Sequence, residues 1–243
     1  MELQEVLDSK VFVKGSSISF NSPKKYIEPF MERVEKLSPS WITDVSAVVS
    51  NAEEEGDMNT AYGRVLVQGL LPGLGTDDSR GIIGMVYALD TVKPVVRVFT
   101  GQNVSVCMNL CIFGTSHLFS ADLLGGGMDA AYKKVEEYVE GKEEEVKFYV
   151  DTIGELKSTE YDSKQVDEIV GALLREALTG KLGSSSIIAA TRKLNNPSSR
   201  YSMVDGHTTG WNIYNAVTEH ISHKVDIFDR AVKTQILSSL MLN

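Results

Sequence analysis

Short runs of β-branched and aromatic residues follow one another through the first half of the chain, bounded by polar or glycine-rich residues. Runs of this length and composition are typical of β-strands. The connections at Asp90-Thr91 and Thr100-Gly101 are short enough to join antiparallel neighbours. We therefore predict an antiparallel meander of three strands at residues 82–89, 93–99 and 103–113, with further strands at 41–50, 60–71 and 118–124.

The first forty residues combine a predicted strand pair with one predicted helix. Residues 6–20 contain two β-rich runs, VFVKG and SISF, joined by a short turn. Asn21 and Ser22, either of which can cap a helix, then precede Pro23, a residue favoured at the first helical position. Apolar residues recur at helical spacing as far as Leu37, so we predict a helix that ends before the Ser-Pro pair that follows.

Two polar segments between the strands are predicted to be loops. Residues 51–59 (NAEEEGDMN) are acidic but lack the ligand pattern of a calcium-binding loop. Residues 72–81 (PGLGTDDSRG) contain Gly-x-Gly without the third glycine of a dinucleotide fingerprint, and no Gly-Lys-Ser/Thr follows. Neither loop therefore indicates a metal or nucleotide site.

From Met128 onward the apolar spacing is typical of helices. Asp162 and Gln165 have the spacing of a capping box, and Gly180 is placed to end the same helix. We predict an α+β fold, in which an N-terminal antiparallel sheet carries a helix-rich C-terminal half packed on it. The mainly β part, with one early helix, covers residues 1–127, the helical part covers 128–243, and the two are expected to form one integrated domain.

The composition is ordinary for a globular protein, with 243 residues of which 42% are hydrophobic and 23% charged. No apolar run approaches the roughly 18 residues that a membrane-spanning helix needs. The N-terminal sequence MELQEVLDSK lacks the basic and apolar segments of a signal peptide. We therefore expect a cytoplasmic protein with no membrane partner.

The two cysteines, Cys107 and Cys111, are too few for a disulfide framework. On the predicted strand 103–113 they share one face at a separation of about 13 Å, at roughly 3.3 Å per residue. Ligands of one zinc ion lie about 2.3 Å from it, so this geometry excludes a shared metal and favours buried structural thiols. His220 and His223 lack the His-Glu-x-x-His pattern, and we predict neither a metal nor a cofactor.

The sequence contains no recognisable catalytic motif. Ser184, Ser185 and Ser186 lack the Gly-x-Ser-x-Gly context of hydrolases, and catalytic carboxylates cannot be selected from 33 acidic residues. We favour a protein without enzymatic activity, and an enzyme with an unrecognised site is a weaker alternative.

The segment TTGWNIYNAVTEHIS, residues 208–222, predicts a short amphipathic helix capped by Thr208 or Thr209. An apolar stripe at helical spacing would consist of Trp211, Tyr214, Val217, Thr218 and Ile221. A tryptophan in such a stripe is typical of a core, and stacking on a nucleic-acid base is the alternative.

Two segments carry motif-like residues. Residues 98–114, VFTGQNVSVCMNLCIFG, contain a Cys-x-Asn element at Cys107 and Asn109. The C-terminal TTGWNIYNAVTEHISH contains Thr-x-Trp-x-x-x-Asn-Ala-x-Thr-Glu, formed by Thr209, Trp211, Asn215, Ala216, Thr218 and Glu219. Both resemble elements of the phage/plasmid-like family catalogued as domain of unknown function 932. The resemblance implies an origin in a phage, prophage or plasmid, a location in the host cell cytoplasm if the chain is phage-encoded, and no established reaction.

Charge is unevenly distributed along a chain whose net charge is −9. Residues 180–243 contain seven Lys/Arg and four Asp/Glu, a net of +3, whereas the preceding 179 residues contain 17 and 29, a net of −12. The stretch RKLNNPSSRYS contains three cations and no acid. The candidate nucleic-acid-binding residues are Lys181, Arg192, Lys193 and Arg200, with Tyr201 as a stacking platform. A solvated polar loop is the alternative interpretation.

We therefore expect a non-enzymatic mobile-element protein that associates with single-stranded nucleic acid in replication or recombination. The alternative is a protein-interaction role, as a virion component or an antagonist of a host defence factor. In that case the partner would be another protein or a second copy of the chain.

Overall fold

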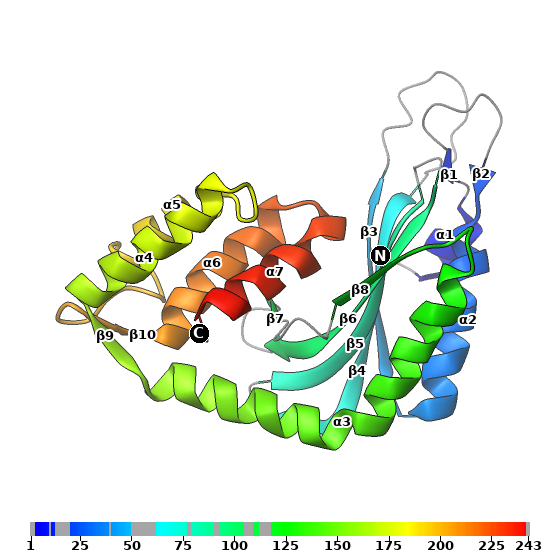
Figure 1. The fold of residues 1–243 in the computed structure, drawn as a ribbon, viewed down its shortest axis with the longest axis horizontal. Coiled ribbons are helices and arrows are strands. Elements are labelled where there is room, and N and C mark those ends of the chain that lie inside the picture. The colour runs from blue at the N-terminus through cyan, green and yellow to red at the C-terminus, as the bar shows by residue number, and fades with distance from the viewer. Residues whose placement is uncertain are drawn as a thin grey trace. The chain divides into compact units, whose positions relative to one another are not determined.

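The computed structural model describes residues 3–9, 11–12, 20–38, 40–49, 62–76, 79–89, 93–104, 109–111 and 118–241. It has the predicted α+β class, with strands concentrated in the N-terminal half and helices in the C-terminal half (Figure 1). The chain divides into two compact units: Met1–Leu74, Arg80–Thr100 and Ser116–Lys142 form the first, and Gly75–Ser79, Gly101–Thr115 and Glu143–Asn243 the second. That the chain forms one integrated domain stays a prediction.

The elements of the described residues have the following bounds. The strands are β1 (Val11–Phe12), β2 (Phe20–Asn21), β3 (Ile42–Val49), β4 (Tyr62–Thr76), β5 (Ser79–Ala88), β6 (Val95–Val104), β7 (Asn109–Cys111), β8 (Leu118–Asp122), β9 (Glu160–Asp162) and β10 (His207–Thr209). The helices are α1 (Leu3–Asp8), α2 (Pro23–Leu37), α3 (Gly127–Ser158), α4 (Ser163–Leu178), α5 (Ser184–Leu194), α6 (Gly210–Lys224) and α7 (Ile227–Met241).

The main sheet has the strand order β3-β4-β5-β6-β7, and β8 also pairs with β6. β3 and β4 are antiparallel, and Ile42 lies opposite Leu70 at the end of their register. β8 pairs antiparallel with the first half of β6, whereas β7 pairs with its last residues, where Val104 lies opposite Asn109. β4, β5 and β6 follow one another both in the chain and in the sheet, as in a meander, but the third strand of the predicted meander is divided between β6 and β7.

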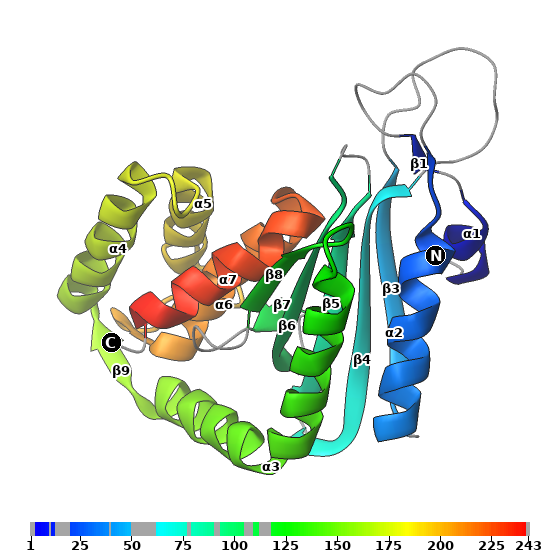
Figure 2. The same cartoon turned by 45° about the vertical axis from the view of Figure 1, so that its right-hand side comes forward.

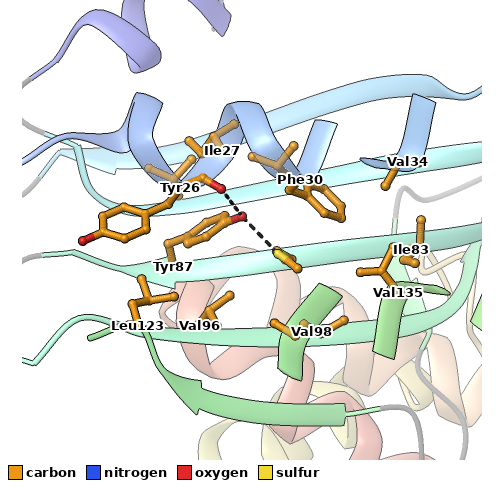
Figure 3. Packing of buried hydrophobic residues seen from close by; sticks show 14 of the residues in the cluster. Tyr26, Ile27, Phe30, Val34, Ile83, Tyr87, Val96, Val98, Leu123 and Val135 are labelled. Carbon is orange, nitrogen blue, oxygen red and sulfur yellow. Dashed lines mark hydrogen bonds between the residues drawn. The ribbon is translucent and has the colours of Figure 1, made fainter. Parts of the chain in front are cut away.

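The core of the first unit lies between one face of the sheet and helices α2 and α3 (Figure 2). Alternate residues of β5, from Ile83 to Tyr87, and Leu89 just after the strand point into this core because successive strand residues face opposite sides. Figure 3 shows Tyr87 in the middle of the cluster, where its hydroxyl donates to the carbonyl of Tyr26 at 3.1 Å and lies 3.0 Å from the sulfur of Met85. The predicted apolar face of α2 supplies the opposite side.

The second unit is built around α6, which contacts α5, α7, β7 and β10. The sequence predicts an amphipathic helix, but α6 is buried around most of its circumference. Its buried residues are Gly210, Ile213, Tyr214, Asn215, Ala216, Val217, Thr218 and Ile221. A helix with neighbours on several sides is apolar on more than one face, and the single-stripe interpretation therefore omitted Ile213 and Ala216.

Local chemistry correctly predicted several helix boundaries. Ser22 is the N-cap residue of α2, and Pro23 occupies the first turn, although Ser22 makes no side-chain cap bond. Asp162 accepts from the backbone N–H of Gln165 at 2.8 Å, and the Gln165 side chain accepts from the Asp162 N–H at 3.0 Å. This is the predicted capping box. α3 continues without a break through Gly141.

The N-terminal prediction is partly wrong, because residues from Val6 to Asp8 belong to helix α1 rather than to a strand. Val6 and Leu7 are buried in the same cluster as α2, and the two helices are in contact. Leu3, Val6 and Leu7 have the i, i+3, i+4 spacing of a helix, and this contact with α2 stabilises a helix of only six residues.

The predicted loop at 72–81 is also corrected, because β4 continues through Pro72 to Thr76 and β5 begins at Ser79. Proline removes one backbone donor and is tolerated in a strand only where that donor is not needed. The register with β3 ends at Leu70, so Pro72 lies beyond the β3 ladder. The predicted acidic loop at 51–59 lies outside the described residues.

A third correction concerns Thr100 and Gly101, predicted as a turn but found inside β6. Pairing with β8 up to Phe99 and with β7 from Gln102 holds the strand extended across both residues. The predicted strand 103–113 is therefore divided between β6 and β7. Cys107 lies outside the described residues, and Cys111 belongs to β7, so the single-strand spacing argument against a shared metal no longer applies.

Candidate nucleic-acid interface

The candidate interface begins at the C-terminal end of α5. Arg192 and Lys193 lie in its last turn, where the helix dipole favours positive charge. The helix ends at Leu194, and its C-cap residue Asn195 donates from the side-chain amide to the carbonyl of Thr191 at 2.9 Å. The following loop turns back, and the N–H of Met203 donates to the carbonyl of Leu194 at 2.9 Å. Arg200 is thereby held close to the end of α5.

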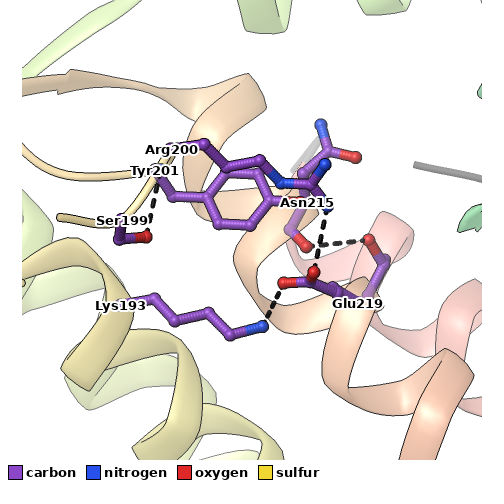
Figure 4. A network of polar contacts seen from close by, with 7 residues as sticks. Lys193, Ser199, Arg200, Tyr201, Asn215 and Glu219 are labelled. Carbon is purple, nitrogen blue, oxygen red and sulfur yellow. Dashed lines mark hydrogen bonds and ion pairs between the residues drawn. The ribbon is translucent and has the colours of Figure 1, made fainter. Parts of the chain in front are cut away.

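Glu219 of α6 joins these two cationic segments (Figure 4). Lys193 donates from Nζ to Oε2 of Glu219, and Arg200 donates from Nη2 to Oε1 at 3.0 Å. The side chain of Glu219 is 22% exposed, that of Lys193 31% and that of Arg200 48%. The carboxylate is therefore the most enclosed of the three groups, and both cations retain a solvent-accessible part.

Tyr201 is placed differently from the predicted stacking platform. Its residue is only 6% exposed and belongs to the core cluster of the second unit. The guanidinium carbon of Arg200 lies 4.8 Å from the ring centroid, and Nζ of Lys193 lies 5.7 Å from it. The ring is therefore used inside the protein, where it supports both cations, and a nucleic-acid base cannot stack on it in this arrangement.

The charge of Glu219 is governed by this environment. Burial alone would raise the pKa of its carboxyl group. The hydrogen bond from Lys193 and the charges of Lys193, Arg200 and His223 outweigh burial and hold the pKa below its ordinary value. Glu219 is consequently ionised throughout the neutral pH range.

The positive charges that favour the ionised form of Glu219 disfavour the ionised form of His220, the next residue of α6. Its pKa is lowered, first by burial and then by the charges of Lys193, Lys224 and His223. Even with Glu219 nearby, positive charge thus makes protonation of His220 less favourable. We use the name basic cluster for Lys193, Arg200, His220, His223 and Lys224. The first two contact Glu219, and the other three follow it at the C-terminal end of α6.

Two further candidates lie outside this cluster. Lys181 is in the connection between α4 and α5, where its Nζ lies 3.6 Å from a carboxylate oxygen of Glu176. Arg192 is exposed, and no ion pair joins it to another residue in the part of the chain that the structure describes. Arg192 is therefore available to an external anion, and Lys181 is partly neutralised.

The motif residues of α6 mainly hold the helix in place. Thr209 is the N-cap and accepts from the N–H of Asn212 at 3.2 Å. Asn215 is buried and donates from its amide to the carbonyl of Trp211 at 2.8 Å, and Thr218 donates to the carbonyl of Asn215 at 3.3 Å. These contacts lie within α6 and its cap, whereas Glu219 reaches two other segments.

Trp211 is partly buried against the core cluster, as the core interpretation predicts. Its ring stacks on Tyr214 with centroids 6.0 Å apart and an interplanar angle of 5°. Nζ of Lys157 lies 5.6 Å from the centroid of the Trp211 ring.

The two motif-bearing segments are neighbours in the fold. Asn109 is the first residue of β7, which contacts α6, the helix that carries Trp211, Asn215, Thr218 and Glu219. Cys107 lies outside the described residues. The structure thus brings together two elements that are about 100 residues apart in the sequence.

Sequence reasoning missed Glu219 as a partner of the cations, and it missed His220, His223 and Lys224 as members of one basic surface. A signal for the surface was present, because the last turn of α6 contains His223 and Lys224. It also missed the tight turn at Asp205-Gly206, where φ is 51° and 77°. An Asp-Gly pair is a strong indicator of a two-residue hairpin turn, and this one leads into β10.

In the part of the chain that the structure describes, no group of three His, Cys, Asp or Glu residues is placed to hold a metal ion. No described helix is both long and apolar enough to cross a membrane. The basic cluster is chemically suited to binding an anion. No family model, curated protein or solved structure matches this chain, and the resemblance noted for residues 98–114 and 208–223 stays a prediction.

Proposed function

We propose that this chain is a non-enzymatic protein that binds single-stranded nucleic acid through the basic cluster and Arg192. One observation carries the proposal: Lys193 of α5 and Arg200 of the loop after α5 meet at the single carboxylate of Glu219, close in the sequence to the basic last turn of α6. This concentration of positive charge occurs in a chain whose net charge is −9. The resemblance to phage and plasmid proteins adds the proposal of a role in replication or recombination of a mobile element.

Binding at this surface would be dominated by phosphate contacts. The buried ring of Tyr201 removes the aromatic platform that the sequence suggested for this surface, so base stacking on Tyr201 makes no contribution in the arrangement described. Contacts to phosphate carry no direct sequence information. The proposed binding is therefore tolerant of sequence and sensitive to salt, and the acidic remainder of the chain confines it to one site.

The salt dependence can be predicted from the number of exposed cations. Three or four phosphate contacts to a single strand give a slope of about −2 to −3 in a plot of log affinity against log salt. Between about 50 and about 200 mM salt, the affinity should then fall roughly 15- to 60-fold.

The test is a fluorescence-anisotropy titration with a labelled oligothymidylate of about 20 nucleotides, longer than the roughly 4–16 nucleotides that one such groove contacts. The variant Arg192→Ala, Lys193→Ala, Arg200→Ala should lose most of the binding. The matched control, Lys133→Ala, Lys134→Ala, Lys164→Ala, removes the same charge on α3 and α4 and should bind like the wild type. Absence of binding by the wild type at the lower salt would contradict the proposal, as would unchanged binding by the first variant.

A protein-interaction role is the second proposal, as a virion component or an antagonist of a host defence factor. It is favoured by exposed apolar side chains in the second unit, among them Leu178 at 88% and Val204 at 72%. Light scattering coupled to size-exclusion chromatography distinguishes a homo-oligomer from a monomer. Neighbouring genes for recombination proteins would support the first role, and neighbouring virion genes the second.

A further inference from the structure

Glu219 occupies the place in the basic cluster where an external anion would bind most strongly. Each of its carboxylate oxygens accepts from a different cation, Oε2 from Lys193 and Oε1 from Arg200. A phosphate group offers the same feature, namely negatively charged oxygens that accept from two cations at once. The protein therefore presents these two cations with an anion of its own.

We propose that Glu219 is an internal competitor for the nucleic-acid site, whose carboxylate must leave Lys193 and Arg200 before they can bind phosphate. This inference rests on the proposed function. It makes the wild-type protein a weaker binder than its cations would allow, and it assigns to Glu219 a regulatory role at the site rather than a contact with nucleic acid.

The two cations have support that does not depend on Glu219. Arg200 and Lys193 both lie over the ring of Tyr201, which is fixed in the core. The N–H of Tyr201 donates to Oγ of Ser199 at 3.2 Å, which fixes the backbone next to Arg200. When the carboxylate leaves, both cations therefore stay close to their present positions, and the site remains organised for a phosphate.

The competition also selects the kind of anion. Glu219 is tethered, so its carboxylate is present at a high effective concentration next to the two cations, on the order of millimolar or higher. A free phosphate ion must displace this carboxylate without the help of any other contact to the protein. A polymer can first bind the exposed Arg192, His223 and Lys224, and its next phosphate is then also tethered. The arrangement thus favours nucleic acid over single phosphate ions.

The pKa of Glu219 is consistent with this role. Burial would raise the pKa, but the hydrogen bond from Lys193 and the neighbouring positive charges lower it. The carboxylate therefore stays ionised near neutral pH and continues to compete. Displacement by another anion, rather than protonation, is the way in which the two cations become available.

The deciding variant is Glu219→Gln, which keeps the length of the side chain and removes its charge. Once the carboxylate has left, the wild type makes the same phosphate contacts as the variant, so the salt slope should be about the same for both. The affinity of the variant should be higher by roughly tenfold, because phosphate no longer has to displace a tethered carboxylate from two charge-assisted contacts. The probe is the labelled oligothymidylate used above.

The matched control is Glu168→Gln on α4. It changes the net charge by the same amount, but its partner Lys164 lies at 4.0 Å in an exposed pair outside the basic cluster. This control should leave the affinity unchanged. Glu219→Asp is a second test, since it keeps the charge but shortens the side chain by one methylene and cannot bridge both cations as well. It should show an intermediate affinity, and circular dichroism confirms the folding of each variant.

The outcomes separate this inference from the proposed function. If the Arg192, Lys193 and Arg200 variant loses binding but Glu219→Gln binds with the wild-type affinity, the site is correct and the competitor role is overturned. Weaker binding by a folded Glu219→Gln protein overturns it too and assigns Glu219 a purely structural role. The inference is also supported if Glu219→Gln binds and the wild type does not, provided that adding Arg192→Ala, Lys193→Ala and Arg200→Ala to Glu219→Gln abolishes the binding. If neither the wild type nor Glu219→Gln binds, both proposals fall.

Discussion

Gly84 lies where two adjacent strands leave no room for a side chain. A Cβ added at Gly84, on β5, would lie 2.8 and 2.9 Å from Cε2 and Cε1 of Phe99 and still closer to its Cζ. Real Cβ atoms do not approach other heavy atoms within 3.0 Å. Phe99 is on the neighbouring strand β6 and is fully buried. The substitution Gly84→Ala therefore requires the Phe99 ring to move inside a packed interior.

The expected change in stability is the difference of two effects. Adding a methyl group to a well-packed interior costs about 1–3 kcal/mol, because side chains must leave their preferred rotamers. Replacing glycine by alanine also restricts the unfolded chain, which offsets roughly 0.4–1 kcal/mol. We expect Gly84→Ala to lower the free energy of unfolding by about 1–2 kcal/mol.

Urea denaturation followed by circular dichroism measures this change. Gly141→Ala is the matched control, because Gly141 is an exposed helical residue of the same unit and a Cβ there meets no atom within 4 Å. It should stabilise the protein by roughly 0.5–1 kcal/mol. Opposite signs for the same chemical change would show that the Phe99 ring, and not the loss of glycine, is responsible.

A double-mutant cycle identifies the contact. Phe99→Leu replaces the ring by a shorter side chain, so Gly84→Ala should cost less in the Phe99→Leu background than in the wild type. If Gly84→Ala is as stable as the wild type, or if the two changes are strictly additive, then Gly84 and Phe99 do not face each other across β5 and β6, and the reasoning fails.

Two other predictions concern the second unit. Trp211→Ala should lower the free energy of unfolding by about 3 kcal/mol, the lower end of the range for large aromatic residues, because Trp211 is only partly buried against Tyr214. Urea denaturation measures this loss, and a variant as stable as the wild type that has lost nucleic-acid binding would instead show that Trp211 contacts the ligand. The pKa of His220 is lowered by burial and by Lys193, Lys224 and His223, so the folded protein binds fewer protons than the unfolded chain just below the ordinary value of 6.5. Its contribution to stability should be complete above pH 6.5 and be lost as the pH falls through the lowered pKa. Urea denaturation at several pH values should show that the free energy of unfolding depends less on pH in His220→Gln than in the wild type. An unchanged pH dependence would contradict the assignment to His220.

Several features of this protein follow from residues that are near one another in the sequence. Pro23 sets the start of α2, and the pair Asp162 and Gln165 sets the start of α4, because a cap is completed within three or four residues. The separation of strand-like and helix-like spacing likewise predicts the α+β class. The excess of cations after residue 180 is a property of the sequence itself.

The main errors arose where partners distant in the sequence decide the outcome. Thr100 and Gly101 remain extended because β8 and β7 pair with β6 on either side of them, and no local preference for a turn outweighs those hydrogen bonds. α1 is helical because Val6 and Leu7 pack in the α2 cluster, although its own length is too short to be stable. Packing overrides local preference in both segments.

The candidate site shows the same division. The sequence determined which residues carry positive charge, but it could not show that Lys193 and Arg200 share Glu219, which lies 26 and 19 residues away from them. Nor could it show that the ring of Tyr201 is buried beneath the two cations. Charge belongs to each residue type, whereas ion pairing and burial depend on which segments the tertiary structure brings into contact.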